Sequence, residues 1–320
     1  MLLFPQSVIQ LFKGGYMRKI WFILMAVVAF SLIGAAVSMA EEKADAEWSP
    51  NSVGPVTAWV APLCDAKTGY VIPRFYFTNF RKQYDNSGNK ESIGDDTKQA
   101  QQQQMIFAAY GLTSKLELDA QISLVENHAT IGDQSASSTG WADSYLYLRY
   151  CLAPEQDNTP CITGMLQLKL PTGKYQDAAA DKLGTDIIGT GSTDLGVGIV
   201  ATKKIKPVIL HGDLSVFHPF KATVDSVKIQ YGNYVNYDLA AEYFLNNGIN
   251  FMAELNGLWQ GKEEDDGVTI DETDVTYLQL APGIGYGNEK FAALLAYQLP
   301  LSGKNTVINE TWVLNFLFSF

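Results

Sequence analysis

Residues 311–320 read Thr-Trp-Val-Leu-Asn-Phe-Leu-Phe-Ser-Phe and stand at the end of the chain. In an extended strand, five apolar side chains fall on one face and three small polar ones on the other: Trp312, Leu314, Phe316, Phe318 and Phe320 against Thr311, Asn315 and Ser319. An apolar strand at the edge of a soluble sheet invites pairing with other chains. A transmembrane β-barrel uses such a strand to close its ring, with the apolar face toward lipid. The stretch therefore favours a transmembrane β-barrel over an edge strand of a soluble β-sandwich.

The same stretch is similar to the C-terminal recognition signal of bacterial outer-membrane proteins, in which alternate hydrophobic positions end in Phe. On that resemblance Trp312, Phe316, Phe318 and Phe320 form an assembly signal, and the barrel assembly machinery is an expected partner. The expected location is the bacterial outer membrane, with its lipid and lipopolysaccharide as further partners.

The beginning of the chain has the three parts of a secretory signal peptide. A basic start at residues 17–19 precedes an apolar core at residues 20–36, and the small residues Ser38 and Ala40 follow. Cleavage after Ala40 is expected. An anchoring transmembrane helix is the weaker alternative, because no basic stop signal follows the apolar run. Residues 1–16 lie upstream of a better start position and are left out of the fold prediction.

Charge excludes one class of partner. Residues 1–40 contain three of the 23 basic residues and none of the 34 acidic ones, so 20 basic residues remain and the mature net charge is −14. Nucleic acid is therefore not an expected partner.

The three cysteines lack metal-ligand spacing. Cys151 and Cys161 flank a Pro-containing turn, and a disulfide between them is one possibility in an oxidising compartment, with Cys64 left over.

Two further parts follow residues 1–40. Residues 41–68 contain Pro50, Pro55 and Pro62 and show no clear period, which indicates a periplasmic N-terminal segment, either loosely ordered or tucked into the barrel. Residues 69–320 show apolar and polar residues in alternation, over segments long enough to cross a bilayer as tilted strands. The clearest segment is residues 115–126.

The predicted fold is an all-β transmembrane antiparallel barrel of about twelve strands. The predicted strands span residues 69–80, 99–110, 115–126, 141–152, 161–170, 192–203, 208–219, 231–244, 249–260, 274–286, 291–300 and 311–320. Connections after even-numbered strands are short, and those after odd-numbered strands are long and polar: 81–98, 127–140, 171–191, 220–230, 261–273 and 301–310. Barrels of this class have long outer loops and tight periplasmic turns, so the alternation supports the strand assignment.

A family resemblance rests on several strand-and-turn motifs. They are Leu-Lys-Leu-Pro-Thr-Gly at 168–173, Gly-Thr-Gly-Ser-Thr-Asp at 189–194, Tyr-Gly-Leu-Thr-Ser-Lys-Leu-Glu-Leu at 110–118, Leu-Ala-Pro-Gly-Ile-Gly-Tyr at 280–286 and Gln-Leu-Pro-Leu-Ser-Gly at 298–303. Over roughly residues 70–320 the chain resembles the outer-membrane family named for the meta-pathway of phenol degradation. The resemblance implies a barrel proposed to admit hydrophobic or aromatic compounds, and it carries over no catalytic residue.

The predicted lumen is charged, because charges at bilayer depth must face water or one another. The lumen-lining candidates are Arg74, Glu117, Asp119, Arg149, Lys169, Asp213, Asp238, Glu242 and Glu254. Such a charged lining suits polar solutes or a salt-bridged plug better than it suits an apolar channel. A charge-paired interior without conduction therefore stays open beside a conducting one.

Three sites of other kinds are weaker readings of the sequence. A lipid-hydrolysing barrel needs a Ser beside a His, and of the three histidines only His211, followed by Asp213 and Ser215 on one strand face, has candidate partners. The glycines at 189–191 lack the third glycine and the helix of a phosphate loop. The acidic residues 263–266, with Asp271, Glu272 and Asp274, could hold Ca²⁺ but lack calcium-loop spacing, so a solvated loop is favoured.

The sequence thus predicts an outer-membrane channel or transporter for passive passage of small molecules, with aromatic or hydrophobic compounds as candidates. No enzymatic activity and no cofactor or metal are expected. The alternatives are a closed structural or surface-interaction barrel and, less favoured, a lipid-modifying barrel enzyme.

Overall fold

The computed structural model describes residues 48–288 and 291–320. The predicted signal peptide and upstream extension lie outside these residues. Within the described part of the chain, no helix is both long and apolar enough to cross a membrane.

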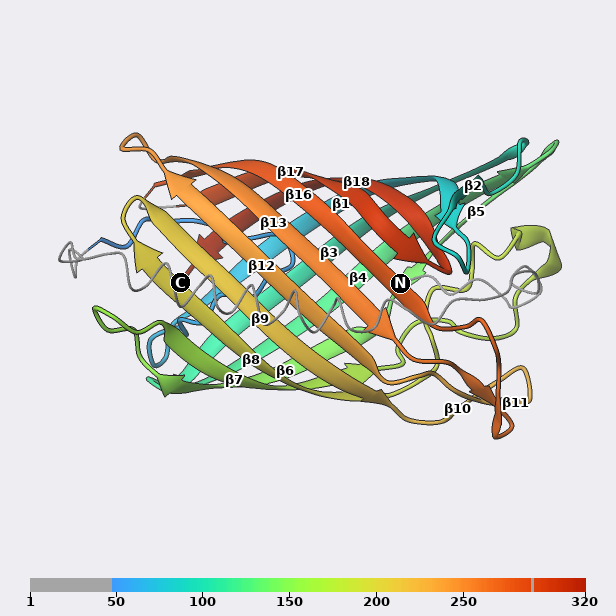
Figure 1. The fold of residues 1–320 in the computed structure, drawn as a ribbon, viewed down its shortest axis with the longest axis horizontal. Helices are drawn as coiled ribbons and strands as arrows, with labels where there is room; N and C mark the ends of the chain where they lie inside the picture. The colour runs from blue at the N-terminus through green and yellow to red at the C-terminus, as the bar shows by residue number, and fades with distance from the viewer. Residues whose placement is uncertain (1–47, 289–290) are drawn as a thin grey trace.

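Twelve long antiparallel strands of the described residues close into a single barrel (Figure 1). Sequential strands are hydrogen-bonded neighbours all round the ring, and the last strand pairs with the first. The strands are β1 (Gly69–Tyr84), β3 (Thr97–Thr113), β4 (Leu116–Ile131), β6 (Ser144–Ala153), β7 (Cys161–Leu170), β8 (Asp194–Ile205), β9 (Val208–Pro219), β12 (Tyr234–Phe244), β13 (Ile249–Gln260), β16 (Val275–Gly287), β17 (Ala292–Lys304) and β18 (Thr306–Ser319). The predicted fold class and strand number are confirmed.

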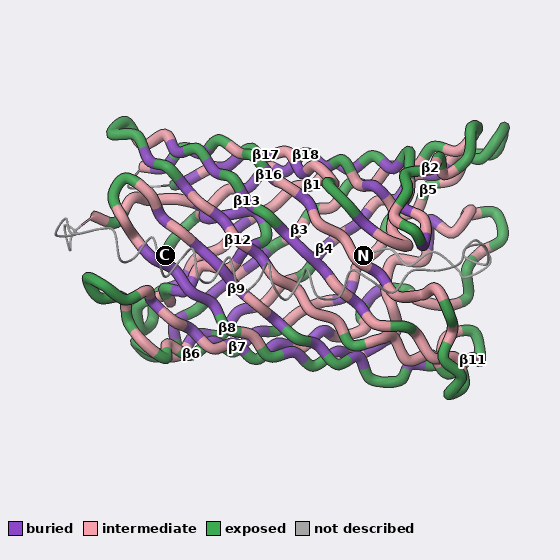
Figure 2. The backbone as a smooth tube through the Cα atoms, viewed as in Figure 1, coloured by how far each residue is buried: buried purple, intermediate pink, exposed green. Residues whose placement is uncertain are grey.

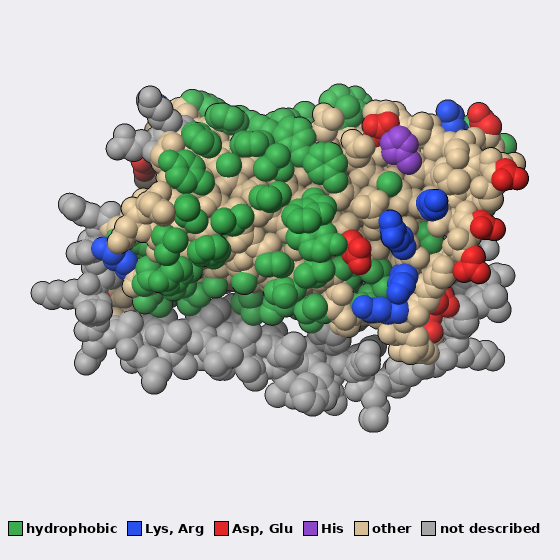
Figure 3. Space-filling view, turned by 90° about the horizontal axis from the view of Figure 1, so that it is seen from above, with side chains coloured by type: hydrophobic (Ala, Val, Ile, Leu, Met, Phe, Trp, Pro, Cys, Tyr) green, Lys and Arg blue, Asp and Glu red, His purple; other side chains and the backbone are tan. Residues whose placement is uncertain are grey.

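Alternation of side chains along each strand sets the two faces of the wall, since successive residues point to opposite sides. On β4, Glu117, Asp119 and Ser123 are buried toward the lumen, whereas Leu118 and Ile122 are exposed on the outside. The buried and exposed stretches interleave around the whole barrel (Figure 2). Figure 3 shows the outer surface on one side of the barrel. Hydrophobic side chains form a wide band there, and charged residues are gathered toward one end.

Short turns lie at one end of the barrel and longer connections at the other, although the predicted connections 127–140 and 301–310 are mostly β-hairpin. The longer connections carry small elements of their own: β2 (Lys90–Ser92), β5 (Gln134–Trp141), the 3₁₀ helix η2 (Ala180–Lys182), and a separate four-stranded sheet of β10 (Ala222–Val224), β11 (Val227–Gln230), β14 (Glu264–Asp265) and β15 (Val268–Thr269). Figure 1 shows β2, β5, β10 and β11 gathered at this end, called here the outer end.

The prediction of a long polar loop over residues 301–310 is wrong. β17 and β18 continue through it and turn at Asn305, whose φ of 49° lies in the left-handed region. The polar residues stay extended because β18 keeps pairing with a lengthened β1, out to Thr306 opposite Tyr84. Beyond the hydrocarbon both faces of a hairpin meet water, so a strand there needs no apolar alternation.

Cys151 and Cys161, between which the sequence makes a disulfide one possibility, are free thiols in this structure, as is Cys64. Cys151 pairs across the ladder with Thr163, which places Cys161 on the diagonal position.

Phe320 adds a backbone pair at one end of the β1–β18 seam that closes the ring. The backbone N–H of Phe320 donates to the Gly69 carbonyl (2.9 Å), and the Gly69 N–H donates back to the Phe320 carbonyl (3.0 Å). We expect deletion of Phe320 to lower the amount of heat-modifiable, membrane-inserted protein, because the Gly69 N–H and carbonyl lose their partners at the end of the seam. Phe320→Ala keeps both backbone bonds and is the control for the side chain. Normal insertion of the deletion variant would contradict this role.

Candidate functional site

The lumen holds a segment of the same chain. Residues 48–64, called here the plug, enter from the short-turn end, where the Asn51 side-chain amide donates to the Asn288 carbonyl. The plug crosses the lumen and returns to the same end, where the Cys64 N–H donates to Glu117 Oε2 (2.5 Å). Of the two alternatives for residues 41–68, loosely ordered or tucked into the barrel, the second describes residues 48–64.

Wall carboxylates bind the middle of the plug through its backbone. Glu254 accepts hydrogen bonds from the N–H groups of Val56 (2.6 Å), Thr57 (2.8 Å) and Ala58 (2.9 Å). The next N–H, of Trp59, donates to Asp213 Oδ2 (2.8 Å). A carboxylate accepting several N–H groups is one of the stronger arrangements available to a buried charge. Through these contacts, the plug supplies hydrogen-bond donors to the charges of Glu254 and Asp213, which otherwise would face an empty lumen.

Arginines bind the plug from the opposite side through its carbonyl oxygens. Arg74 Nη1 donates to the Val56 carbonyl (2.7 Å), and Arg149 Nη2 donates to the Val60 carbonyl. The Arg149 guanidinium also lies over the Trp59 ring, 5.2 Å from its centroid. The Trp59 ring in turn packs edge-on against Tyr147 of the wall, with ring centroids 4.7 Å apart.

Arg149 has a second role as the counter-charge of two buried carboxylates. Its side chain is 1% exposed, and Nη1 lies 2.6 Å from Glu117 Oε1 and 3.6 Å from Asp119 Oδ2. Glu117 thereby joins the wall to the plug, because its other oxygen accepts the Cys64 N–H. The structure thus brings Arg74, Arg149 and Glu117, three predicted lumen residues, into contact around the plug.

Asp238 and Glu242 complete the acidic side of the lumen. Asp238 stands directly opposite Asp213 on the neighbouring strand, and Asp238 Oδ1 accepts a hydrogen bond from Asn256 (2.8 Å). Glu242 accepts hydrogen bonds from Ser52 of the plug and from Asn250. Together with Glu117, Asp119, Asp213 and Glu254 they make six carboxylates, against the two guanidiniums of Arg74 and Arg149.

His211 does not form a hydrolytic site. Its Nε2 lies 3.1 Å from Glu242 Oε1, and its Nδ1 lies 3.0 Å from the hydroxyl of Thr202, which also accepts the Ala61 N–H. The hydroxyl of Ser215 instead accepts a hydrogen bond from Gln167. The imidazole is therefore turned away from the serine that it would have to activate.

Lys169, the remaining lumen candidate, lies nearer the outer end. Its Nζ lies 2.8 Å from Asp194 Oδ2 and donates to the hydroxyls of Thr190 (2.6 Å) and Ser192 (3.1 Å). Asp143 accepts from the N–H and the hydroxyl of Thr190. The network fastens residues 171–193 to the inner wall.

This network gives a physical reason for two of the motifs. Lys169 belongs to the first, and Thr190, Ser192 and Asp194 belong to the second. The two loop ends also touch at Gly173 and Gly189, where a Cβ on Gly189 would stand 2.6 Å from the Gly173 carbonyl oxygen. The motifs therefore specify how the loop is held.

The middle of the same loop is held separately against the wall. The Asn127 side chain donates to the Thr185 carbonyl (3.0 Å), and Lys174 Nζ lies 2.5 Å from Asp186 Oδ2. Partial burial alone would raise the pKa of Asp186, but the hydrogen bonds from Lys174 and from the Ala179 N–H hold that pKa below its ordinary value. The loop thus stays charged and pinned at neutral pH.

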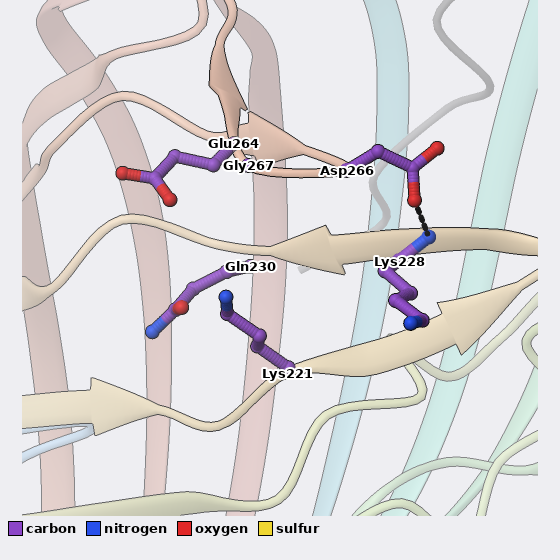
Figure 4. Close-up of a pocket in the computed structure, with 6 residues that line it drawn as sticks. All are labelled: Lys221, Lys228, Gln230, Glu264, Asp266 and Gly267. Atoms are coloured by element: carbon purple, nitrogen blue, oxygen red, sulfur yellow. Dashed lines mark hydrogen bonds between the residues drawn. The ribbon is translucent and has the colours of Figure 1, made fainter.

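A hollow of about 280 Å³ lies outside the lumen, on the four-stranded sheet at the outer end (Figure 4). It is lined by Lys221, Lys228, Gln230, Glu264, Asp266 and Gly267. In the neighbouring acidic loop, Asp271 pairs with Lys262 (2.5 Å) and Asp274 with Lys304 (2.6 Å). Among the described residues, no three or more His, Cys, Asp or Glu side chains form a group that could hold a metal ion.

The residues of the predicted assembly signal lie along β18. Trp312 and Phe318 are exposed on the outside, Phe316 is half-buried, and Phe320 closes the ring. Sequence reasoning missed Asp143, Asp194, Thr202 and Asn256, which bind the loop and the plug or orient the carboxylates that do. Asp194 alone carried a signal, as the last residue of a motif.

The fold and the lumen define a membrane-spanning β-barrel whose bore is occupied by its own N-terminal segment. A family model described as "Putative MetA-pathway of phenol degradation" matches residues 80–316. The chain belongs to this family, and the resemblance read from the motifs is confirmed.

Several solved structures are similar to this chain. An outer membrane channel from Pseudomonas putida F1 has a TM-score of 0.68 at 15% identity, over 84% of this chain and 100% of that one. A monoaromatic hydrocarbon channel, CymD, has a TM-score of 0.43 at 12% identity, over 80% of this chain and 89% of that one. The translocator domain of the autotransporter NalP from Neisseria meningitidis has a TM-score of 0.42 at 9% identity, over 93% and 98%. No curated protein sequence matches the chain.

Proposed function

We propose that the protein is a bacterial outer-membrane channel for passive passage of small molecules, which opens when the plug leaves the lumen. The observation that carries the proposal is the way the lumen is filled. Its wall carboxylates and arginines bind the backbone of a separate segment, the plug, which is joined to the barrel at residues 65–68. A segment held by hydrogen bonds can leave as a unit, whereas interlocked side chains of the wall cannot.

Two comparisons support a channel. The chain spans the full length of the similar structure from Pseudomonas putida, which is described as an outer membrane channel. The family description refers to phenol degradation, which points to aromatic solutes. We propose that the protein carries out no catalysis, since His211 lies beside Glu242 and Thr202 and away from Ser215.

The charge of the lumen indicates which aromatic compounds would pass. Six carboxylates and two guanidiniums line the part of the bore around the plug. A bore with that excess raises the local concentration of cations and lowers that of anions. We therefore propose aromatic solutes with a positive charge ahead of neutral or anionic ones.

The test uses purified full-length mature protein in planar bilayers and in liposomes. We expect small, intermittent conductance steps in KCl, and faster liposome entry of tyramine than of 4-hydroxybenzoate, because the two solutes carry opposite charges on similar rings. Protein-free liposomes give the background. Ion-tight bilayers together with no entry of either solute would overturn the channel.

The plug also favours a second candidate, a closed structural barrel. In that case the plug is a permanent part of the core, and the long outer connections are the functional surface. A barrel that stays ion-tight after removal of the plug would support this candidate, because the channel proposal requires that variant to conduct.

A further inference from the structure

A group of basic side chains lies on the outside of the barrel near the outer end, on β1 and β3. Arg81, Lys82 and Lys98 are all exposed. Phe80 pairs with Gln99 at the last position of the β1–β3 ladder, so Arg81 and Lys98 occupy the next position on the two strands. A β-bulge between Phe80 and Lys82 adds an extra residue to β1 there. The bulge brings Arg81 and Lys82 to the surface together.

The height of this group along the barrel places it at the membrane surface. Phe77 stands opposite Trp312, and both are exposed on the outside. The Trp312 ring lies 4.6 Å from the Tyr297 ring. Exposed aromatic residues of this kind mark the edge of the hydrocarbon in barrels. Arg81 lies four residues beyond Phe77, about 13 Å along the strand and about 9 Å along the membrane normal at a 45° tilt. That is the level of lipid headgroups.

The three charges lack acidic partners. Within residues 48–288 and 291–320, neither an ion pair nor a side-chain hydrogen bond is formed by Arg81, Lys82 or Lys98. By contrast, six other cations of the described residues pair with carboxylates: Arg149, Lys169, Lys174, Lys203, Lys262 and Lys304. Like charges on adjacent strand positions repel each other. An arrangement that places them together without a carboxylate is stabilised when an anion binds between them.

Two of the acids near this group are already engaged. Asp85 accepts the N–H groups of Ser87 and Asn89 in its own turn, and Glu91 accepts from the Gln83 side chain (2.7 Å). Glu310 lies closer to the membrane, opposite Asn79. Figure 3 shows several Lys and Arg side chains just past the hydrophobic band toward one end. In a chain with an excess of acids, this group is a local exception.

We propose that Arg81, Lys82 and Lys98 bind a phosphate of lipid A, the phosphorylated lipid anchor of lipopolysaccharide. The inference rests on the proposed outer-membrane location. A guanidinium beside two ammonium groups matches the charge and oxygen geometry of a phosphate monoester. The acyl chains of the same lipid would lie along the apolar band below, over Phe77 and Trp312. A free phosphate ion gains nothing from that band, so the lipid is the favoured source of the phosphate.

The experiment measures binding of lipid A to full-length mature protein in nanodiscs. We expect the triple variant R81Q/K82Q/K98Q to bind bisphosphorylated lipid A about 100-fold more weakly than the wild type, since each basic residue near a charged membrane surface strengthens binding several-fold. The control variant K67Q/K115Q/K221Q removes three exposed lysines elsewhere and is expected to bind like the wild type. Heat-modifiable migration verifies that each variant is folded.

Two further ligands test whether the bound phosphate belongs to lipid A. Dephosphorylated lipid A is expected to bind the wild type and the triple variant equally, and inorganic phosphate at millimolar concentration is expected to leave lipid A bound. Equal binding of lipid A by both proteins, or full displacement by inorganic phosphate, would overturn the proposal. If the triple variant does not insert, K82Q/K98Q carries the same test with about a 20-fold expected loss. Conductance is not the readout, so a failure here leaves the channel proposal untouched.

Discussion

Removal of the plug is expected to raise the mean conductance of the barrel by about 100-fold or more. Six backbone N–H groups of the plug donate to the wall, from Val56, Thr57, Ala58, Trp59, Ala61 and Cys64. At a net contribution of about 0.5 kcal/mol or more for each bond, the plug is displaced less than about 1% of the time. A mature chain without residues 48–64 has no such restraint, and single-channel recording in KCl measures the difference.

The open barrel is also expected to prefer cations. The deletion leaves Asp213, Glu242 and Glu254 without the donors that the plug supplied, so their charge faces the bore. The reversal potential in a KCl gradient measures the preference. Adding D213N and E254Q to the deletion is the matched control, because it keeps side-chain size and removes two charges. That control is expected to conduct equally well with a weaker preference for K⁺.

If the shortened chain does not fold, a point substitution in the full chain tests the same role of the plug. Glu254→Gln in the full chain retains an oxygen acceptor but loses the charge that strengthens three hydrogen bonds. We expect more frequent openings than in the wild type. A folded deletion variant that stays ion-tight would show that the wall closes the lumen unaided, and the closed structural barrel would then be the better account.

The barrel wall could be predicted because the membrane imposes one rule on every strand. Residues 115–126 alternate almost without error, since one face meets lipid and the other the lumen. The rule does not apply outside the hydrocarbon, so the polar residues 301–310 give no sign in the sequence that they form a hairpin of two strands. The lumen charges followed from the same rule, because a charge such as Glu254 or Arg149 cannot face lipid.

The plug could not be predicted as such, because its contacts are made by backbone groups with residues far away in the sequence. Val56 and Glu254 are separated by 198 residues. One signal was present in the sequence. Residues 48–64 contain no charged residue, although the chain around them is rich in acids. A segment without charges can enter an acidic lumen and offer its N–H groups to the carboxylates.

Arg149→Met is expected to destabilise the barrel by about 3–5 kcal/mol. The substitution keeps an unbranched side chain but removes the counter-charge of Glu117 and Asp119. A buried charge that loses its partner is strongly destabilising. The plug also loses the donor to the Val60 carbonyl. Urea unfolding from lipid vesicles, followed by tryptophan fluorescence, measures the change. Lys115→Met, at an exposed turn, is the control and is expected to change stability by less than about 0.5 kcal/mol.

Neutralising Glu117 and Asp119 in the Arg149→Met variant distinguishes the effect of unpaired charges from the effect of lost packing. In R149M/E117Q/D119N no buried charge is left unpaired at this site, and the side-chain amide oxygen introduced by E117Q can still accept the Cys64 N–H that Glu117 accepts in the wild type. We expect the triple variant to regain most of the lost stability, because replacing a whole buried ion cluster by neutral groups is often close to neutral. If the triple variant is as unstable as Arg149→Met, the contact of Arg149 with Trp59 and Val60 holds the plug by packing, and the charges contribute little.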